Sequence, residues 1–316
     1  MPRCYLGAHL SKEWVDLYHP KDETHHKIAN KPRAIRAFLQ TMQADDILIF
    51  EATSGCDDTL LAQIRAQGVA FVRVNPAHAW YFGRACNLPK TDQVDARMLS
   101  AFGAARNLEP QHSTSLAREQ LKSLVRRRRQ YKDMETQEKN RLKRVTDPAL
   151  KRDIQSLLVV FARRVEKLAQ QIAEHLKKHQ ELHATSRVLA SAPGIGPVTA
   201  SVLVADMPEL GSADRRQVAS LAGLAPRAYE SGKYKGKRRL GAGRRHVRKV
   251  LYMAALSVIA QGRFFQPFIA RMKAEGKANK TIIMAVARKL LAILNTLVRQ
   301  QQPFDMKKMS MNLLPQ

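Results

Sequence analysis

Three acidic residues have the types and spacing that a divalent metal site requires. Asp92 and Asp95 are three residues apart in a segment of helical character, so we expect their carboxylates to share one helix face, about 5–6 Å apart. Glu51 directly follows the apolar run Ile47–Phe50. Carboxylates that converge repel each other unless a cation lies between them, and Mg²⁺ prefers oxygen ligands of this kind. The alternative interpretation is a first helical turn whose acids stabilise the helix dipole.

Ser231 is a second candidate for chemistry. It lies in the glycine-rich stretch Gly223–Lys249, which holds ten basic residues and one acid, Glu230. Neighbouring cations would stabilise both a serine alkoxide and the charge that develops on an attacked phosphodiester. A serine beside a glycine is also common in turns and caps, so this pair alone leaves a structural role open.

Two further segments predict contacts with nucleic acid. The run Arg126–Arg129 is either a phosphate contact or a solvated face. Pro193–Gly196 separates two helical segments and resembles a helix-hairpin-helix motif, in which glycines and helix amides approach a phosphate; a plain tight turn is the alternative. The residues expected to bind nucleic acid are Arg126, Arg127, Arg128, Arg129, Gly194, Gly196, Arg227, Lys233, Lys235, Lys237, Arg238, Arg239, Arg244, Arg245, Arg248 and Lys249.

The elements that would position the acids form an α/β pattern over the first hundred residues. Strands are expected at 3–10, 13–18, 25–30, 47–50 and 70–74, and helices at 32–42, 57–67, 78–84 and 92–105. Three leading strands followed by helix–strand repeats are typical of the ribonuclease H-like fold.

Residues 113 to 182 are highly charged and contain no glycine, which predicts a long helical hairpin. Asp147 and Pro148 have the types that cap and begin its second helix. Apolar residues from Leu157 to Leu176 recur at steps of four and three, so they form one packing stripe, as in a bundle or a coiled-coil arm. Near the end, the apolar segment 281–298 contains Arg288 and Lys289, which favours a buried amphipathic helix over a membrane span.

The overall charge points to a polyanionic partner. The 316 residues include 54 Lys and Arg against 27 Asp and Glu, a formal charge of +27. Nucleic acid is favoured over a membrane surface because the sequence shows no lipidation signal and no uninterrupted span. The three cysteines, Cys4, Cys56 and Cys86, lack Cys-x-x-Cys spacing, and no signal segment is seen. We therefore expect a cytoplasmic protein with neither a disulfide framework nor a structural zinc.

The motifs together resemble the transposases of insertion-sequence family 110. The same order is found there for Glu51-Ala52-Thr53, Asn75-Pro76-Ala77, Lys90-Thr91-Asp92 with Val94-Asp95-Ala96-Arg97, Pro193–Gly196, Ala222–Arg227 and Ser231-Gly232, and the resemblance covers essentially the whole chain. It implies a RuvC-like domain at 1–110 with an Asp-Glu-Asp-Asp set, a helical coiled-coil arm at 111–184 and a mostly helical transposase domain at 185–316. Residue by residue, it implies Glu51, Asp92 and Asp95 as catalytic metal-site residues and Ser231 as the nucleophile that becomes joined to DNA.

The resemblance also implies partners. Family members form homodimers and homotetramers with composite active sites, and a structured bridge RNA pairs with both donor and target DNA. The chain is thus expected to be an RNA-guided, Mg²⁺-dependent DNA recombinase, with Mn²⁺ as a substitute ion. The alternatives are a RuvC-like junction nuclease that uses water as the nucleophile and a catalytically disabled RNA- and DNA-binding protein.

One position departs from the family pattern. The segment Gly7–Lys12 places His9 where the family has its first aspartate, so the acidic set is incomplete. Asp16, on the neighbouring strand, is a substitute that matches a different family position. An imidazole brings one nitrogen and no negative charge, so His9 should weaken Mg²⁺ binding.

Overall fold

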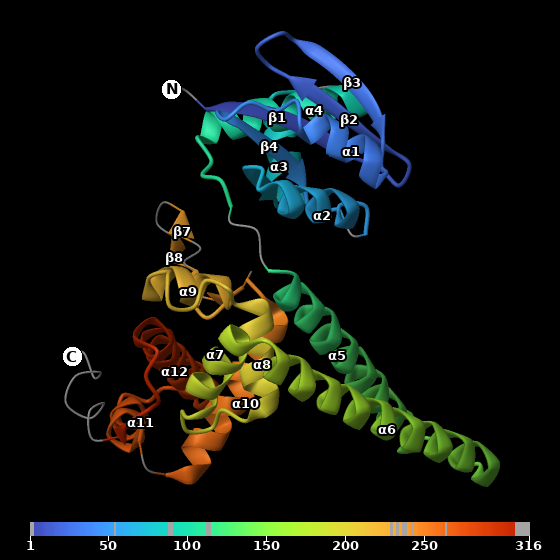
Figure 1. Cartoon of the computed structure of the whole chain (residues 1–316). Helices are drawn as coiled ribbons and strands as arrows, with labels where there is room; N and C mark the ends of the chain where they lie inside the picture. The colour runs from blue at the N-terminus through green and yellow to red at the C-terminus, as the bar shows by residue number, and fades with distance from the viewer. Residues whose placement is uncertain are drawn as a thin grey trace. The chain divides into compact units, whose positions relative to one another are not determined.

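The computed structural model describes residues 3–53, 55–87, 91–111, 115–227, 230–231, 234–235, 239–241, 243–262 and 264–306, with the backbone alone at 227, 230–231, 234–235 and 239. The chain divides into two compact units, residues 1–114 and 115–316 (Figure 1). The second unit contains both the predicted arm and the predicted C-terminal domain.

A five-stranded sheet forms the centre of the first unit. Its strands are β1 (Cys4–Leu10), β2 (Trp14–His19), β3 (Thr24–Ala29), β4 (Asp46–Glu51) and β5 (Phe71–Val74), in the order β3-β2-β1-β4-β5. The first three strands are antiparallel neighbours, whereas β1, β4 and β5 are parallel. The predicted α/β character and the predicted succession of strands and helices are confirmed.

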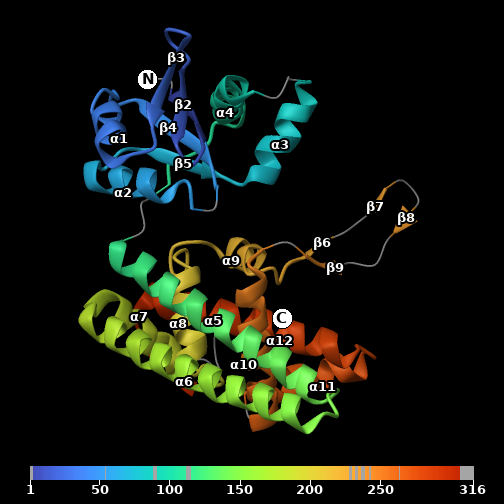
Figure 2. The same ribbon diagram turned by 90° about the vertical axis from the view of Figure 1, so that its right-hand side faces the viewer.

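Two pairs of helices cover the two faces of this sheet (Figure 2). The helices α1 (Pro32–Leu39) and α2 (Asp58–Gln67) pack on the side chains of Leu6, Ala8, Leu48 and Phe50. The helices α3 (Pro76–Ala85) and α4 (Asp92–Arg106) pack on Tyr5, Ile47, Ile49 and Val72. Side chains alternate between faces along a strand, so the odd-numbered residues of β1 and β4 point toward α4.

Gly7 allows α4 to lie directly on β1. A Cβ atom at this position would come within 1.8 Å of the carbonyl oxygen of Ala96, which is backbone and cannot move aside. Glycine is therefore required there, and it places the first turn of α4 beside the end of β1.

The second unit begins with the predicted hairpin of α5 (Leu116–Leu142) and α6 (Pro148–Lys178), which pack along each other. The Asp147 side chain caps α6 by accepting hydrogen bonds from the amides of Ala149 and Leu150, as its position predicts. The apolar stripe of α6 differs at its start: Leu157 is 39 % exposed, whereas Ile154 is buried and Leu158 half-buried. From Phe161 to Leu176 the predicted residues are buried or half-buried, so the predicted stripe is confirmed except at Leu157.

Six further helices complete this unit, which is mostly helical as predicted: α7 (Gln180–Ala190), α8 (Pro197–Asp206), α9 (Arg215–Leu221), α10 (Arg245–Gln261), α11 (Gln266–Ala274) and α12 (Asn279–Gln300). The last helix has the length and hydropathy of a membrane span, but it packs against α7, α9, α10 and α11. Its buried residues, including Leu290, Leu294 and Leu297, belong to the main hydrophobic core. The prediction of a buried helix is confirmed.

A long loop between α9 and α10 carries four two-residue strands. The strand β6 (Pro226–Arg227) pairs with β9 (Arg239–Leu240), and β7 (Glu230–Ser231) pairs with β8 (Tyr234–Lys235) (Figure 2). The backbone of Ser231 therefore lies in a small antiparallel pair, in the section of the loop between β6 and β9.

Candidate metal site and nucleic-acid interface

His9 and two of the predicted acids converge where β1 ends and α4 begins. His9 Nε2 lies 3.6 Å from Asp92 Oδ1, and His9 Nδ1 lies 3.9 Å from Asp95 Oδ2. The Thr91 side chain caps α4 by accepting a hydrogen bond from the Val94 amide, which sets both aspartates in the first turn. The close packing at Gly7 then brings this turn to residue 9.

Glu51 lies on the same face of the sheet. It is the last residue of β4, and the pairing of β1 with β4 extends to Ala8 opposite Phe50, one residue before His9 and Glu51. Since Ile47 and Ile49 face α4, Glu51 does as well. The predicted metal residues thus all lie in the first unit, at one end of the sheet and on the face that α4 covers.

Asp16 adds a further carboxylate to this face, because it stands directly opposite His9 in the pairing of β1 with β2. It is buried, and Lys27 Nζ lies 3.7 Å from its Oδ1. The ion pair with Lys27 gives Asp16 a structural partner of its own.

The donor chemistry of this end of the sheet fits a divalent cation. Glu51, Asp92 and Asp95 offer carboxylate oxygens, and the last two lie in a first helical turn that is open to solvent on one side, since Asp92 is 61 % exposed in its side chain. His9 replaces one oxygen donor by nitrogen, a set that suits Mn²⁺ better than Mg²⁺.

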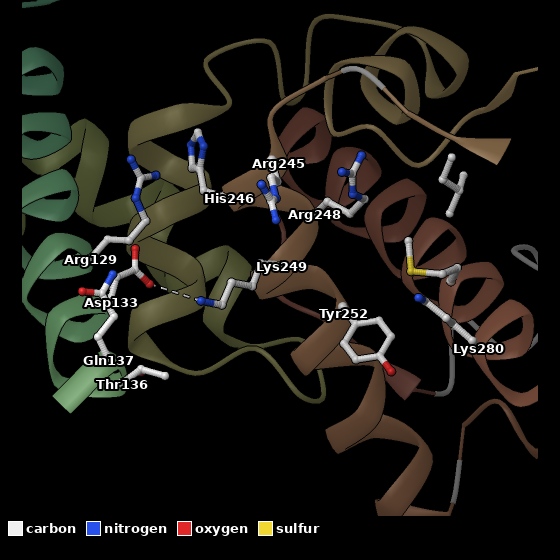
Figure 3. A pocket seen from close by; sticks show the side chains of 12 residues that line it. Arg129, Asp133, Thr136, Gln137, Arg245, His246, Arg248, Lys249, Tyr252 and Lys280 are labelled. Atoms are coloured by element: carbon white, nitrogen blue, oxygen red, sulfur yellow. Dashed lines mark hydrogen bonds and ion pairs between the residues drawn. The ribbon is translucent and has the colours of Figure 1, made fainter. Parts of the chain in front are cut away.

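A separate basic cavity lies in the second unit, where α5, α10 and α12 meet (Figure 3). It has a volume of about 1080 Å³, and Leu240 of β9 is part of its wall. It brings together four residues from the predicted basic set, namely Arg129, Arg245, Arg248 and Lys249. Among the described residues of the lining, Asp133 is acidic, and its Oδ1 lies 3.3 Å from Lys249 Nζ. The cavity therefore has an excess of positive charge.

Two helix N-termini strengthen the attraction of this cavity for anions. Arg245 is in the first turn of α10 and Lys280 is in the first turn of α12, and neither turn contains an acid. Cations are unfavourable at the positive end of a helix dipole, so the arrangement favours a bound anion such as phosphate. Sequence reasoning missed Lys280 and Tyr252, also in the lining. The sequence feature that could have pointed to Lys280 is its position in the first turn of a long apolar helix.

Other residues of the predicted basic set have partners within the protein. The Arg244 guanidinium donates to both carboxylate oxygens of Glu209, at 2.7 and 2.5 Å. Arg127 donates to the side chains of Gln130 and Tyr131, while Arg126 is exposed on α5. Arg244 and Arg127 thus have local contacts, and none of the three arginines belongs to the cavity lining.

The two glycines of the predicted phosphate-binding turn differ. Gly194 has φ +76°, and a Cβ atom there would lie 2.4 Å from Val258 Cγ2 of α10, so this glycine serves packing. Gly196 precedes α8, and a Cβ atom there would meet no atom within 4 Å. Only the second position faces open space.

Ser231 and most cations of its loop can be placed only in part. The Ser231 and Lys235 backbones belong to β7 and β8, and those of Arg227 and Arg239 to β6 and β9. Lys233, Lys237 and Arg238 lie outside the described residues. The role of Ser231 as the nucleophile stays a prediction.

Comparisons with known proteins place the chain in a family. A transposase model named for the DEDD type of IS110 matches residues 14–149, and the model described as "Transposase IS116/IS110/IS902 family" matches residues 186–269. The pilin gene-inverting proteins of Moraxella lacunata and Moraxella bovis are 30 % and 31 % identical to it, over 96 % of this chain and 98 % of theirs. The chain belongs to the IS116/IS110/IS902 family of transposases. The predicted resemblance is confirmed.

The segments matched in this transposase bear on the site. Glu51, Asp92 and Asp95 fall within the first match, whereas β1 and His9 precede it. The second match contains Gly194, Gly196 and Ser231. DEDD transposase domains typically depend on divalent metal ions, and the family acts on DNA. A 43.6 kDa protein of insertion element IS110 from Streptomyces coelicolor is also similar, with 29 % identity over 38 % of this chain.

Proposed function

We propose that this transposase joins donor DNA to target DNA by RNA-guided strand exchange, with Ser231 as nucleophile and a divalent ion held by Glu51, Asp92, Asp95 and residue 9. The observation that carries the proposal is the convergence of His9 with both aspartates of α4 on the face that also bears Glu51. The sheet order β3-β2-β1-β4-β5 supports the assignment of this unit as a RuvC-like, ribonuclease H-like domain.

The chemistry at Ser231 follows from the charge of its loop. As the hydroxyl loses its proton, a bond forms from its Oγ to phosphorus while the bond from phosphorus to the leaving deoxyribose oxygen breaks, and that oxygen takes up a proton. The surrounding cations would stabilise the negative charge of the attacked phosphate. A bound Mg²⁺ would neutralise the carboxylates and orient phosphate oxygens.

The relatives support recombination as the outcome. The two Moraxella proteins are named for inverting a pilin gene, and an inversion joins two sites of DNA in a new order. We propose the same class of reaction for this chain, in the cytoplasm. From the family resemblance we also propose homodimers or homotetramers in which one subunit supplies the serine and another the acids.

The basic cavity would hold the phosphate backbone of DNA or of a bridge RNA. Its cations would bind phosphate groups and would not read base edges. Recognition of sequence would then depend on pairing between RNA and DNA. A structured RNA that copurifies reproducibly with the protein would support this part, and its absence from an active preparation would contradict it.

The decisive experiment uses a suicide DNA substrate that traps a covalent complex. Ser231→Ala removes the nucleophile but none of the charge, so we expect the covalent complex to disappear while affinity for DNA changes less than about twofold. Ser220→Ala, on the exposed surface of α9, is the matched control and should retain the complex. Retention of strand exchange by Ser231→Ala would refute the serine mechanism.

His9 favours a second candidate, a binding protein without recombinase activity. Its ring already lies between the two aspartates, where the family has an additional acid. Tight nucleic-acid binding without covalent complex or nicked product would select this candidate. Nicked product without a covalent complex would select a junction nuclease that uses water.

A further inference from the structure

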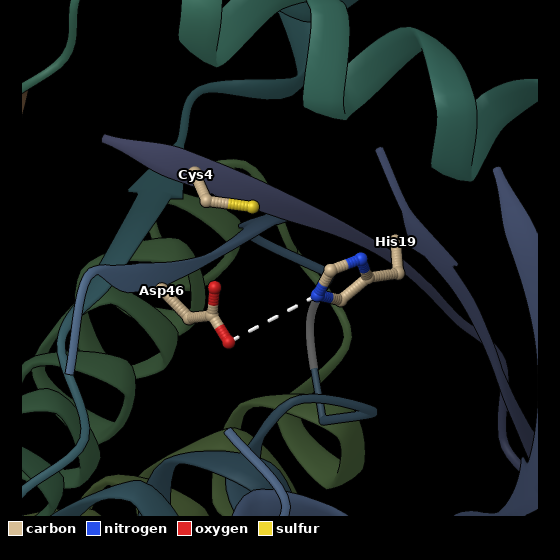
Figure 4. Close-up of side chains that lie close together, drawn as sticks. All are labelled: Cys4, His19 and Asp46. Atoms are coloured by element: carbon tan, nitrogen blue, oxygen red, sulfur yellow. Dashed lines mark ion pairs between the residues drawn. The ribbon is translucent and has the colours of Figure 1, made fainter. Parts of the chain in front are cut away.

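Three side chains with metal-binding chemistry meet at the opposite end of the sheet from His9. Cys4 is the first residue of β1, Asp46 is the first residue of β4, and the two are paired in register. His19 is the last residue of β2, which runs antiparallel to β1, so its side chain reaches the same end (Figure 4). Each of the three is two residues away from a leucine that packs against α1 and α2, namely Leu6, Leu17 or Leu48. Residues two apart on a strand point to the same face, so all three lie on the face covered by α1 and α2.

Distances and burial at this cluster suit one ion. A sulfur, a nitrogen and an oxygen atom of the three residues all lie within 4.8 Å of one another. Ligands on tetrahedral zinc, with bonds of about 2.0 to 2.3 Å, are roughly 3.3 to 3.7 Å apart, so each pair needs to close by at most about 1.5 Å. Cys4 is 6 % exposed and Asp46 3 % exposed, which keeps competing water away.

Asp46 has an oxygen directed into the cluster. Its Oδ2 accepts a hydrogen bond from the Gln43 amide at 2.7 Å, whereas its buried Oδ1 has no nitrogen or oxygen donor within hydrogen-bond distance among the described residues, and the thiol of Cys4 is a weak donor to the same carboxylate. Lys21 Nζ is 3.7 Å from Oδ1, but it lies nearer to Asp45, at 3.1 Å, and its side chain is 47 % exposed. A buried carboxylate oxygen without a hydrogen bond is costly, and a metal ion would satisfy it.

His19 presents one ring nitrogen to Asp46 and the other to Asp22. Its Nε2 lies 4.0 Å from Asp46 Oδ2, and its buried Nδ1, which has no hydrogen-bond partner among the described residues, lies 3.6 Å from Asp22 Oδ2. A carboxylate bonded to the far nitrogen of a metal-bound histidine fixes the ring and its tautomer, and Asp22 would make this bond by approaching less than about 1 Å closer.

We propose that Cys4, His19 and Asp46 bind one zinc ion, with Asp22 as the outer partner of His19. Thiolate, imidazole and carboxylate together select zinc over Mg²⁺, which prefers oxygen. Three protein ligands leave a fourth position for water, on the side of a cavity of about 830 Å³ that His19 and Asp46 both line. The ion would join β1, β2 and β4, the strands that carry His9, Asp16 and Glu51. The spacing of the cysteines along the sequence gave no sign of this site.

The test uses Co²⁺ as a spectroscopic substitute in the full chain, purified without a tag. A thiolate bound to Co²⁺ gives a charge-transfer band that carboxylates cannot give, so binding at the acids near His9 does not contribute. We expect the wild type and the variant Cys56→Ser with Cys86→Ser, which keeps Cys4 as its one thiol, to show the band equally. Cys4→Ser should lose it.

Competition with Zn²⁺ then measures affinity. Zn²⁺ should displace the cobalt at one equivalent per chain, and Asp22→Asn should weaken Zn²⁺ binding by about 10- to 100-fold, as loss of an outer partner does. This variant changes an exposed carboxylate, so it should fold even if buried variants do not. A wild type without the band, a band that survives Cys4→Ser, or unchanged affinity in Asp22→Asn would overturn the proposal.

Discussion

Replacing His9 by aspartate should make the stability of the first unit depend on Mg²⁺. The substitution puts another carboxylate beside Asp92 and Asp95, whose oxygens lie 3.6 and 3.9 Å from the two imidazole nitrogens of His9. Two charges about 4 Å apart interact by about 1 kcal/mol in water and about 4 kcal/mol at an effective dielectric constant of 20. Asp92 is 61 % exposed, so the lower value applies to its pair, whereas Asp95 is 22 % exposed and its pair falls between the two values. Together the two pairs should cost about 2 to 5 kcal/mol without metal.

Mg²⁺ should then offset this loss. An ion that binds only the folded state at 100 times its dissociation constant adds about 2.7 kcal/mol to the free energy of unfolding. We therefore expect His9→Asp to be less stable than the wild type without divalent ions and to gain at least about 2 kcal/mol at saturating Mg²⁺. The wild type should gain little from Mg²⁺, and Mn²⁺ should serve it better because manganese accepts nitrogen ligands.

Denaturant unfolding followed by tryptophan fluorescence measures these changes in the full chain. The two tryptophans, Trp14 and Trp80, both belong to the first unit, so the signal reports on that unit alone. His78→Asp, an exposed site in the first turn of α3, makes the same change of charge and serves as the control. Strand exchange measured on the same proteins should rise in Mg²⁺ for His9→Asp.

An equal response of wild type and His9→Asp to Mg²⁺ would show that residue 9 is not a ligand. Full strand exchange by the histidine form at low Mg²⁺, with no gain from aspartate, would refute the same reasoning by an independent measurement.

Two further predictions concern the second unit. Arg245→Gln combined with Lys280→Gln should weaken nucleic-acid binding and lower the slope of log affinity against log salt by up to about 0.9 for each lost duplex phosphate contact; an unchanged slope would exclude the basic cavity as the interface. Because both cations lie at helix N-termini, thermal unfolding should show no loss of stability. Gly194→Ala should lower the free energy of unfolding by about 1–3 kcal/mol, because the new methyl group would clash with Val258 and the residue has a positive φ. Gly196→Ala should change it by less than about 1 kcal/mol. Equal effects of the two substitutions in denaturant titrations would contradict the packing role of Gly194.

Local patterns predicted the elements of the fold well. The apolar run Ile47–Phe50 could bury both faces only inside a sheet, and it forms the centre of β4. Asp147 followed by Pro148 has one favourable use, the start of a helix, and α6 begins there. These features depend on neighbours in the sequence, so the sequence alone was enough to find them.

Features that depend on tertiary packing could not be predicted in this way. Arg129 and Lys280 are far apart in the sequence and line one cavity only because α5, α10 and α12 come together in the fold. In the sequence, Gly194 was compatible both with a phosphate-binding turn and with a tightly packed turn. The position of Val258 in the structure decides for packing. Cys4 and Asp46 come together through strand register, which no spacing of cysteines reveals.

The backbone contact at Gly7 makes residue 9 a suitable position for directed evolution. The distance between β1 and α4 is set by the contact of Gly7 with Ala96, so it does not depend on the size of the side chain at residue 9. A library of all twenty amino acids at that position would therefore vary ligand chemistry on a constant scaffold. Selection from such a library in different metal ions would rank side chains by the ion they accept, and would yield recombinases controlled by the metal supplied.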